Sequence, residues 1–203
     1  MPAKDIIDIC LKTEALKRLP RTGWKIVGAE IGTSESIASH LWGTSFVSLL
    51  IASHLISDGV EVNLERVLKG AVLHDLAESV TSDIPKSAII LGGETAKSAK
   101  KKMEDEALHH LFEKFQNGTF DLRDSIIDLS MDSSIEARIV RTSDILDMLL
   151  HATVLEQAGV SPLLLTPFFK TSEDSLKELG IDIGIQIYQI LLSNHQDALQ
   201  RIK

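Results

Sequence analysis

Apolar residues recur every three to four positions along most of this chain, which is the spacing of amphipathic helices. A first helix is predicted over residues 4–19, and the glycine-containing segment 21–33 is expected to be a loop. A serine cap, at Ser34 or Ser36, then opens a long helix that ends at Asp58. The first part of the chain is therefore predicted to be two helices joined by a loop.

The rest of the chain continues in the same manner. Asn63 is expected to cap a helix over residues 64–80, and a break at Gly92-Gly93 precedes a charged amphipathic helix over 94–115. The remaining predicted elements are a short helix from Asp121, a longer helix from Ser133 or Ser134 to about residue 158, a loop marked by Pro162 and Pro167, and helices over 172–179 and 183–202. No repeat or linker interrupts this pattern, so the chain is predicted to be one all-α domain spanning residues 1–203.

The composition is that of a globular protein. The 203 residues are 44% hydrophobic and 25% charged, which is ordinary and is enough for one domain with a sizeable core. The formal net charge of −8 argues against a broad basic face for binding a nucleic-acid polymer. A small anionic substrate is compatible with that charge, because one metal ion and a few cationic side chains suffice to hold a phosphate.

The sequence also indicates a compartment. Cys10 is the only cysteine, so no disulfide can form within the chain, which fits a reducing cytoplasm. The N-terminal segment carries Asp5 and Asp8 and has no long apolar core, so a signal peptide is not expected. No apolar run is long enough to span a bilayer. We therefore expect a cytoplasmic location and no membrane partner.

The dipeptide His74-Asp75 stands in LKGAVLHDLAE, an apolar run that predicts a buried helix. An imidazole and a carboxylate are costly to bury on such a helix, and a divalent metal ion would compensate both. By itself the dipeptide also fits a pair on a helix surface. His40 in ESIASHLWG and Asp144 in IVRTSDILDM extend it to a set drawn from three predicted helices. Facing helices of a bundle build internal metal sites in this way.

The segments that carry these residues resemble the HD-domain metal-dependent phosphohydrolases. The similar segments are LKRLPRTGW, ESIASH, VLHDLAESVTSDIPKS and TSDILDMLLHA, and they extend from about residue 16 to residue 156. The subgroup that they resemble is the 5′-deoxynucleotidases, which remove phosphate from deoxyribonucleoside 5′-monophosphates. The resemblance implies an HD-domain helical bundle with a metal site between core helices, and helices over 172–202 packed on the same core.

The resemblance also assigns roles. It implies that His40, His74, Asp75 and Asp144 bind one divalent transition metal, and that Glu78 is catalytic. Two imidazoles and two carboxylates suit Mn²⁺, Fe²⁺, Co²⁺, Ni²⁺ or Zn²⁺ better than Ca²⁺. Glu78 follows His74 by four residues and Asp75 by three, so all three can face one cavity. A carboxylate in that place can orient or deprotonate a water molecule, although an exposed acid at a helix end would give the same spacing.

Three more residues are assigned to the substrate side by the same resemblance. Asp83 in SDIP is expected to be catalytic and to accept a hydrogen bond from the sugar, or simply to cap its turn. Arg21 offers a planar fork suited to phosphate oxygens. Trp24 is expected to pack against the sugar or base, or to anchor the loop in the core. Ser82 stands where the family usually has glycine.

The predicted function is hydrolysis of (deoxy)ribonucleoside 5′-monophosphates to nucleoside and phosphate by a metal-activated water. One alternative is an HD phosphodiesterase or triphosphohydrolase, with His109 or His110 holding a second metal. Another is a non-catalytic nucleotide sensor, suggested because Ser39 replaces the acid that usually precedes the first histidine. Asp147 and His151 share the face of Asp144 and either tune the metal site or are satisfied core groups. The apolar stretch LLLTPFF covers the core or joins two copies, and we expect a homodimer.

Overall fold

The computed structural model describes residues 3–30, 32, 34–113 and 133–201. Within these ranges the regular structure is helical, apart from an isolated antiparallel β-bridge between Pro20 and Ser36. The elements are α1 Ala3–Thr13, the 3-10 helix η1 Glu14–Lys17, α2 Thr22–Val27, α3 Ile37–Ser57, α4 Leu64–Leu73, α5 Glu78–Thr81, α6 Lys86–Phe112, α8 Ile135–Gln157, α9 Pro162–Leu179 and α10 Asp182–Arg201. The predicted all-α class is confirmed.

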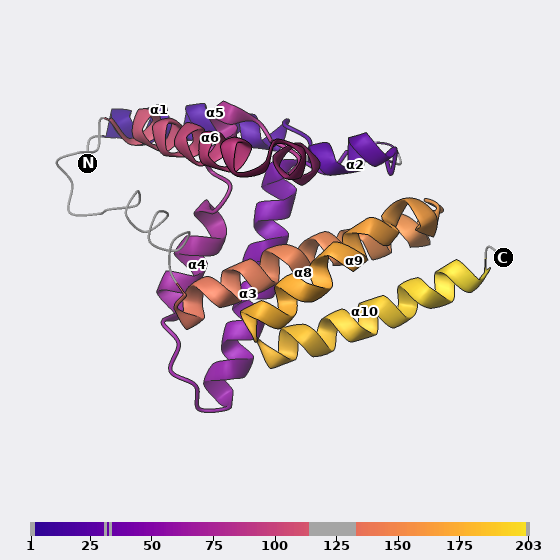
Figure 1. The fold of residues 1–203 in the computed structure, drawn as a ribbon. Coiled ribbons are helices and arrows are strands. Elements are labelled where there is room, and N and C mark those ends of the chain that lie inside the picture. The colour runs from indigo at the N-terminus through magenta and orange to yellow at the C-terminus, as the bar shows by residue number, and fades with distance from the viewer. Residues whose placement is uncertain (1–2, 31, 33, 114–132, 202–203) are drawn as a thin grey trace.

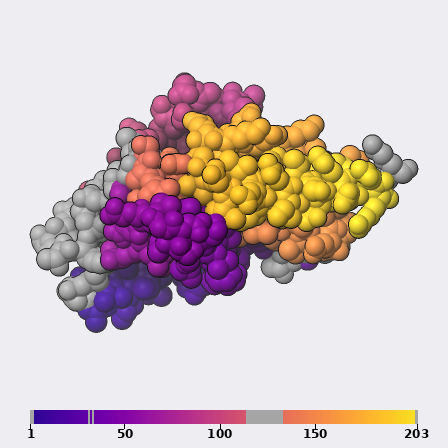
Figure 2. Space-filling view, turned by 90° about the horizontal axis from the view of Figure 1, so that it is seen from below, coloured from indigo at the N-terminus to yellow at the C-terminus, as the bar shows by residue number. Residues whose placement is uncertain are grey.

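The helices form two groups joined by α3 (Figure 1). α1, α2, α5 and α6 lie together at the top of the view, whereas α8, α9 and α10 pack side by side below them. α3 crosses from one group to the other and packs against both α4 and α8. In the view from below, α10 runs along the surface in yellow beside α9 in orange (Figure 2).

Two hydrophobic clusters correspond to these two groups. The larger cluster joins α3, α4, α8, α9 and α10, and includes the fully buried Leu146, Leu149 and Leu165. The smaller cluster joins the first turn of α3 to η1 and the end of α6, through residues such as Ile37 and Leu108. The N-terminal turns of α3 therefore lie where the two clusters meet.

Capping residues explain the two longest predicted helices. The Ser36 side chain accepts the amide N–H of Ser39 at the start of α3, and the Ser134 side chain accepts that of Ala137 at the start of α8. Both helices end within a residue or two of their predicted ends. The short helix expected from Asp121 lies outside the described residues.

The prediction of a loop over residues 21–33 is wrong in its first half. Residues Thr22–Val27 form the short helix α2, which ends at Gly28 in the left-handed conformation with φ of 69°. The glycines suggested an irregular segment, yet Gly28 acts as a C-terminal cap. The helix is stabilised from a distant part of the chain, since Asp83 accepts the backbone N–H of Thr22.

The single helix predicted over residues 64–80 is also wrong. α4 ends at Leu73, a turn follows, and α5 begins at Glu78 and ends before Ser82, whose φ is 62°. Apolar residues continue through the turn, where Leu76 and Ala77 are buried, so the pattern did not reveal the break. His74 and Asp75 therefore lie in the turn after α4, with side chains 17% and 19% exposed, rather than in the middle of a helix.

Of the two interruptions predicted from glycine and proline, the one at the glycine pair is present and the one at the two prolines is not. The break predicted at Gly92-Gly93 is present as a kink in α6, where Gly93 has φ of 60° and ψ of −150°. The loop predicted at Pro162 and Pro167 is instead part of α9, with Pro162 in the first turn, where a missing N–H costs nothing. None of the helices formed by the described residues is long and apolar enough to cross a membrane.

Candidate metal centre and adjoining cavity

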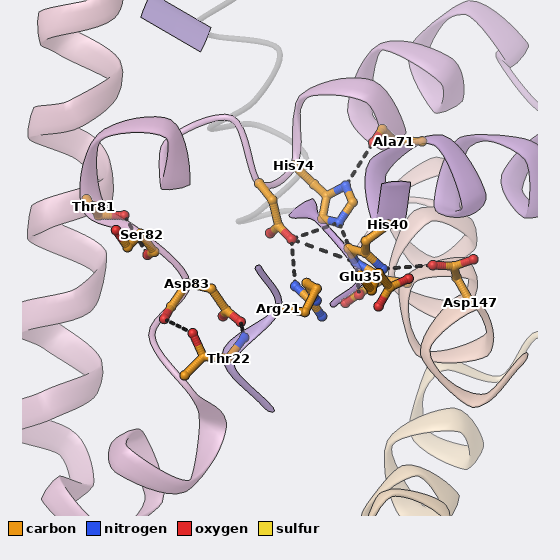
Figure 3. A network of polar contacts seen from close by, with 12 residues as sticks. Arg21, Thr22, Glu35, His40, Ala71, His74, Thr81, Ser82, Asp83 and Asp147 are labelled. Carbon is orange, nitrogen blue, oxygen red and sulfur yellow. Dashed lines mark hydrogen bonds and ion pairs between the residues drawn. The ribbon is translucent and has the colours of Figure 1, made fainter. Parts of the chain in front are cut away.

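Three of the predicted ligands, His40, His74 and Asp75, lie together where α3 meets the turn after α4, and Asp144 on α8 lies beside His40. Figure 3 shows His40 and His74 pointing toward each other. His40 is fully buried in the second turn of α3, and its Nε2 atom lies 3.0 Å from Asp144 Oδ1 on α8. The same Nε2 atom lies 3.4 Å from His74 Nε2 and 3.7 Å from Asp75 Oδ2. His74 Nε2 and Asp75 Oδ2 are 3.4 Å apart. One ligand atom each from His40, His74 and Asp75 thus lies within 4.8 Å of the other two, and Asp144 Oδ1 lies beside the His40 atom.

The other nitrogen of each imidazole is fixed by an oxygen atom. Nδ1–H of His40 donates to Asp147 Oδ2 at 2.8 Å, and Nδ1–H of His74 donates to the carbonyl of Ala71 at 2.8 Å. Because these oxygens accept, both Nε2 atoms are directed toward each other. Histidine ligands of protein metal sites are oriented in this way. The donor set and its orientation therefore fit a divalent metal ion.

The charges around His40 also favour a cation at this place. Burial disfavours its imidazolium, but hydrogen bonds to Asp144 and Asp147 outweigh that effect and raise the pKa of His40 to about 10. Burial likewise disfavours the charged form of Asp144, but the hydrogen bond from His40 and the nearby positive charges hold its pKa below its ordinary value. A proton on Nε2 and a metal cation compete for the same place.

Glycine makes room for the carboxylate that orients His40. Asp147 lies against Gly43, one turn after His40 on α3, and a Cβ atom at that position would collide with the Asp147 carboxylate. Glu35 lies close by, with a carboxylate oxygen within 4.8 Å of the ring nitrogen of His40 and an oxygen of Asp147. The sequence left the role of Asp147 open. In the structure its carboxylate accepts a hydrogen bond from Nδ1 of His40.

A cavity of about 510 Å³ opens beside the ligands, within the usual range for small-molecule sites. The residues that line it include the carboxylates of Asp75, Glu78, Asp83 and Asp144 and the cations Arg21, Lys86 and Lys100. Apolar side chains also line it, among them Val27, Met148 and Phe168. The cavity thus combines charged groups, two of them predicted metal ligands, with apolar side chains.

Arg21 borders both the ligands and the cavity. Its NH1 group donates to Asp75 Oδ2 at 3.1 Å, and its backbone N–H donates to the carbonyl of Glu35. Burial acts to lower the pKa of Arg21, but the charges of Asp75, Asp144 and other carboxylates raise it above its ordinary value. The guanidinium is therefore a fixed positive charge at the metal-binding end of the cavity.

Glu78 is buried at the cavity wall, with only 3% of its surface exposed. Its Oε2 atom has no hydrogen-bond partner among the described residues. Burial and the nearby carboxylates of Asp75 and Asp83 raise the pKa of Glu78 to about 9. The alternative of an exposed acid at a helix end is therefore wrong. An unpartnered buried carboxyl is suited to a bound water or substrate atom.

Asp83 and Trp24 are placed as structural supports. Asp83 Oδ2 accepts the Thr22 N–H at 2.5 Å, so it caps α2 while also lining the cavity. Trp24 is only 3% exposed, donates its indole N–H to Glu35 at 2.7 Å, and packs on Phe168 with ring centroids 4.5 Å apart. Trp24 is not among the described residues that line the cavity, so its position agrees with the anchoring alternative.

The remaining candidates lie elsewhere. His109 and His110 are exposed on α6, and neither belongs to a group of possible metal ligands among the described residues. Ser39 bonds to the capping Ser36 through both its N–H and its hydroxyl.

The sequence did not single out Glu35 and Lys100, because each stands in a segment that looks like an ordinary polar surface. The available signal for Glu35 was its position directly before Ser36, the residue that caps α3.

The chain is similar to an HD-domain family model and to several known proteins. The HD domain family model matches residues 13–179. The 5′-deoxynucleotidase HDDC2 of Danio rerio is 33% identical over 162 residues, covering 78% of this chain and 73% of the relative. The protein of the same name from Xenopus laevis is 25% identical over 200 residues, covering 97% and 90%. The crystal structure of the PH0347 protein of Pyrococcus horikoshii OT3 matches with a TM-score of 0.76 and 33% identity, covering 94% of this chain and 98% of that one.

Proposed function

The chain belongs to the HD-domain family, and from this membership we propose that it is a metal-dependent phosphomonoesterase acting on (deoxy)ribonucleoside 5′-monophosphates. The observation that carries the proposal is the cluster of His40, His74 and Asp75, with Asp144 beside His40, next to the cavity of about 510 Å³. The relatives named 5′-deoxynucleotidases support the choice of substrate class. The apolar side chains that line the cavity suit a nucleoside, and its cationic side chains suit a phosphate.

The proposed cofactor is one divalent ion of Mn, Co, Ni, Fe or Zn. The two Nε2 atoms and the carboxylates of Asp75 and Asp144 would hold it, a mixed nitrogen and oxygen set that suits these metals. Such an ion supplies Lewis acidity toward the phosphoryl group and toward water. Asp147 and the Ala71 carbonyl keep both imidazoles directed at it.

Glu78 transfers a proton in the proposed reaction, and Arg21 and Asp83 serve to bind and position the phosphate. Glu78, as the carboxylate, accepts the proton that the attacking water loses as its oxygen bonds to phosphorus and the bond to the sugar oxygen breaks, and that proton ends on the sugar oxygen. The Arg21 guanidinium acts to lower the pKa of Glu78, and the positive charge of a loaded site would act in the same direction, which makes the carboxylate form available near neutral pH. Arg21 also donates to phosphoryl oxygens, where negative charge accumulates during transfer. Asp83 holds the start of α2, and thereby Arg21, in place.

The test is an assay of phosphate release by the full chain loaded with Mn²⁺ or Co²⁺. The substrates are all deoxyribonucleoside and ribonucleoside 5′-monophosphates, with deoxynucleoside triphosphates and cyclic nucleotides for comparison. We expect turnover of monophosphates, and a loss of about 10²- to 10⁴-fold in kcat for Glu78→Gln at full metal content. A metal-loaded protein that hydrolyses no monophosphate contradicts the proposal, and hydrolysis of only the comparison substrates favours the phosphodiesterase or triphosphohydrolase alternative.

A homodimer is part of the same proposal. The apolar stretch 163–169 divides between core and surface, since Leu165 and Phe169 are buried whereas Leu163 is 65% exposed. On α3, Trp42 and Phe46 stack on each other and are 71% and 49% exposed. Exposed apolar side chains of this size are typical of interfaces. Light scattering across a concentration series tests the proposal, because a mass of one chain at all concentrations would contradict it.

A further inference from the structure

Lys100 lines the cavity from the part of α6 that follows the kink of this helix. Ile90, before the kink, lines the same cavity. Gly93, between them, has φ of 60° and ψ of −150°, a conformation that is open essentially to glycine alone. Both parts of α6 therefore contribute to the cavity wall.

The surroundings of Lys100 set it apart from the other lysines of α6. Its side chain is 30% exposed, whereas that of Lys97, one turn earlier, is 72% exposed. Lys100 Nζ lies 3.1 Å from Glu104 Oε1, one turn later on α6, which limits the conformations of the lysine. Burial acts to lower the pKa of Lys100, but the negative charges of Glu104, Glu78 and Asp75 raise it. Lys100 is therefore a held positive charge that faces the carboxylates of the site.

The charge balance of the cavity leaves a role for such a cation. Four carboxylates line the cavity, and Arg21 already donates to Asp75. A phosphate monoester brings almost two more negative charges at neutral pH. Lys86 also lines the cavity, but it is exposed at the first residue of α6. Lys100 is thus the more enclosed of the two lysines that can meet the phosphate.

Resting on the proposed function, we propose that Lys100, which lines the cavity from the second part of α6 and is held by Glu104, is a second protein cation that binds the substrate phosphate. Its ammonium group donates hydrogen bonds to non-bridging phosphoryl oxygens on the α6 side of the cavity, whereas Arg21 donates from the α2 side. No bond is made or broken by Lys100. Its contribution is to binding of the phosphoryl group in both substrate and product.

The experiment measures binding of inorganic phosphate and of the nucleosides thymidine and deoxyadenosine to the Mn²⁺-loaded full chain. It compares wild type with Lys100→Met and Lys100→Arg, and with Lys97→Met as the matched control from the same helix. Lys100→Met should bind phosphate about 10-fold or more weakly, as expected for a lost hydrogen bond to a charged group, with nucleoside binding unchanged. Lys100→Arg should keep most of the phosphate affinity, and Lys97→Met should match wild type.

The outcomes separate this inference from the proposed function. Phosphate affinity of Lys100→Met equal to that of Lys97→Met overturns the inference, even if the protein hydrolyses nucleotides. An equal loss of phosphate and nucleoside binding, or of bound metal, shows a structural role and also overturns it. A wild-type protein that hydrolyses no monophosphate, yet loses phosphate affinity selectively in Lys100→Met, refutes the proposed function and leaves Lys100 as a phosphate ligand.

Discussion

The orientation of His40 depends on one hydrogen bond that the sequence could not specify. Nδ1–H of His40 donates to Asp147, whose carboxylate occupies the space that a Cβ atom at residue 43 would need. Partners of this kind typically change metal affinity by about 10- to 100-fold when they are mutated. Asp147→Asn is therefore expected to weaken Mn²⁺ binding by about that factor, measured by metal titration of the chelator-treated protein.

A control and a second variant sharpen this prediction. Asp197→Asn removes an exposed carboxylate on α10 and is expected to leave metal affinity unchanged. Gly43→Ala should reproduce the effect of Asp147→Asn without altering any ionisable group, because the added methyl group displaces the carboxylate. Wild-type affinity in both Asp147→Asn and Gly43→Ala would show that the contact does not orient the ligand.

Burial of Glu78 predicts a pH dependence of stability. Its pKa rises from an ordinary value of 4.5 to about 9 on folding, so the folded state retains a proton that the unfolded state releases. The stability that this carboxyl contributes is present below pH 4.5 and is lost as the pH rises toward about 9. Glu78→Gln, which stays neutral, should gain Tm relative to wild type across this window in the metal-free protein.

The control for this effect is Glu61→Gln, which alters an exposed carboxyl. Its Tm difference from wild type should not vary with pH. Thermal melts at intervals between pH 5 and pH 9 measure both differences. A difference for Glu78→Gln that stays constant over that range would mean that Glu78 ionises normally in the folded protein.

Among the secondary-structure elements, the three C-terminal helices are joined by a buried polar cluster. His195 of α10 is 2% exposed, and its Nδ1 lies 2.5 Å from Glu156 Oε1 of α8. Its Nε2 lies 3.1 Å from Thr166 Oγ1 of α9, and its ring stacks on Phe169 with centroids 4.2 Å apart. His195 therefore contacts α8 and α9 at once.

Removal of this histidine tests how much the cluster stabilises the helices. His195→Ala leaves the buried Glu156 without this partner and is expected to lower the free energy of unfolding by about 3 kcal/mol. The exposed His54→Ala should change it by less than about 0.5 kcal/mol. Denaturant titration measures both values. An equal, small effect of the two substitutions would assign the association of these helices to apolar packing alone.

Local signals predicted the helices that begin at good N-caps, and failed where distant contacts decide. Ser36 and Ser134 marked the starts of α3 and α8 because a cap is read from a few adjacent residues. α2 is supported by Asp83, which is 61 residues away from Thr22 in the chain, so no local pattern could indicate it. The break between α4 and α5 has no glycine or proline within residues 74–77 to mark it in the sequence.

On the scale of the whole molecule, the site lies where two hydrophobic clusters meet. Its metal-binding residues come from segments that could be singled out because a buried imidazole or carboxylate is costly in an apolar run. Three further residues contact or line the site. Glu35 and Lys100 stand in polar surroundings in the sequence, whereas Asp147 stands in an apolar run and its role was left open. The contacts of all three became known only from the folded structure.

The most direct test of the account is anomalous diffraction from a crystal of the full chain loaded with Mn²⁺. The account predicts one strong peak at bonding distance, about 2.0–2.3 Å, from His40 Nε2, His74 Nε2 and oxygens of Asp75 and Asp144. A peak held by other residues, or an ion that leaves His40 or Asp144 outside its coordination sphere, would contradict it.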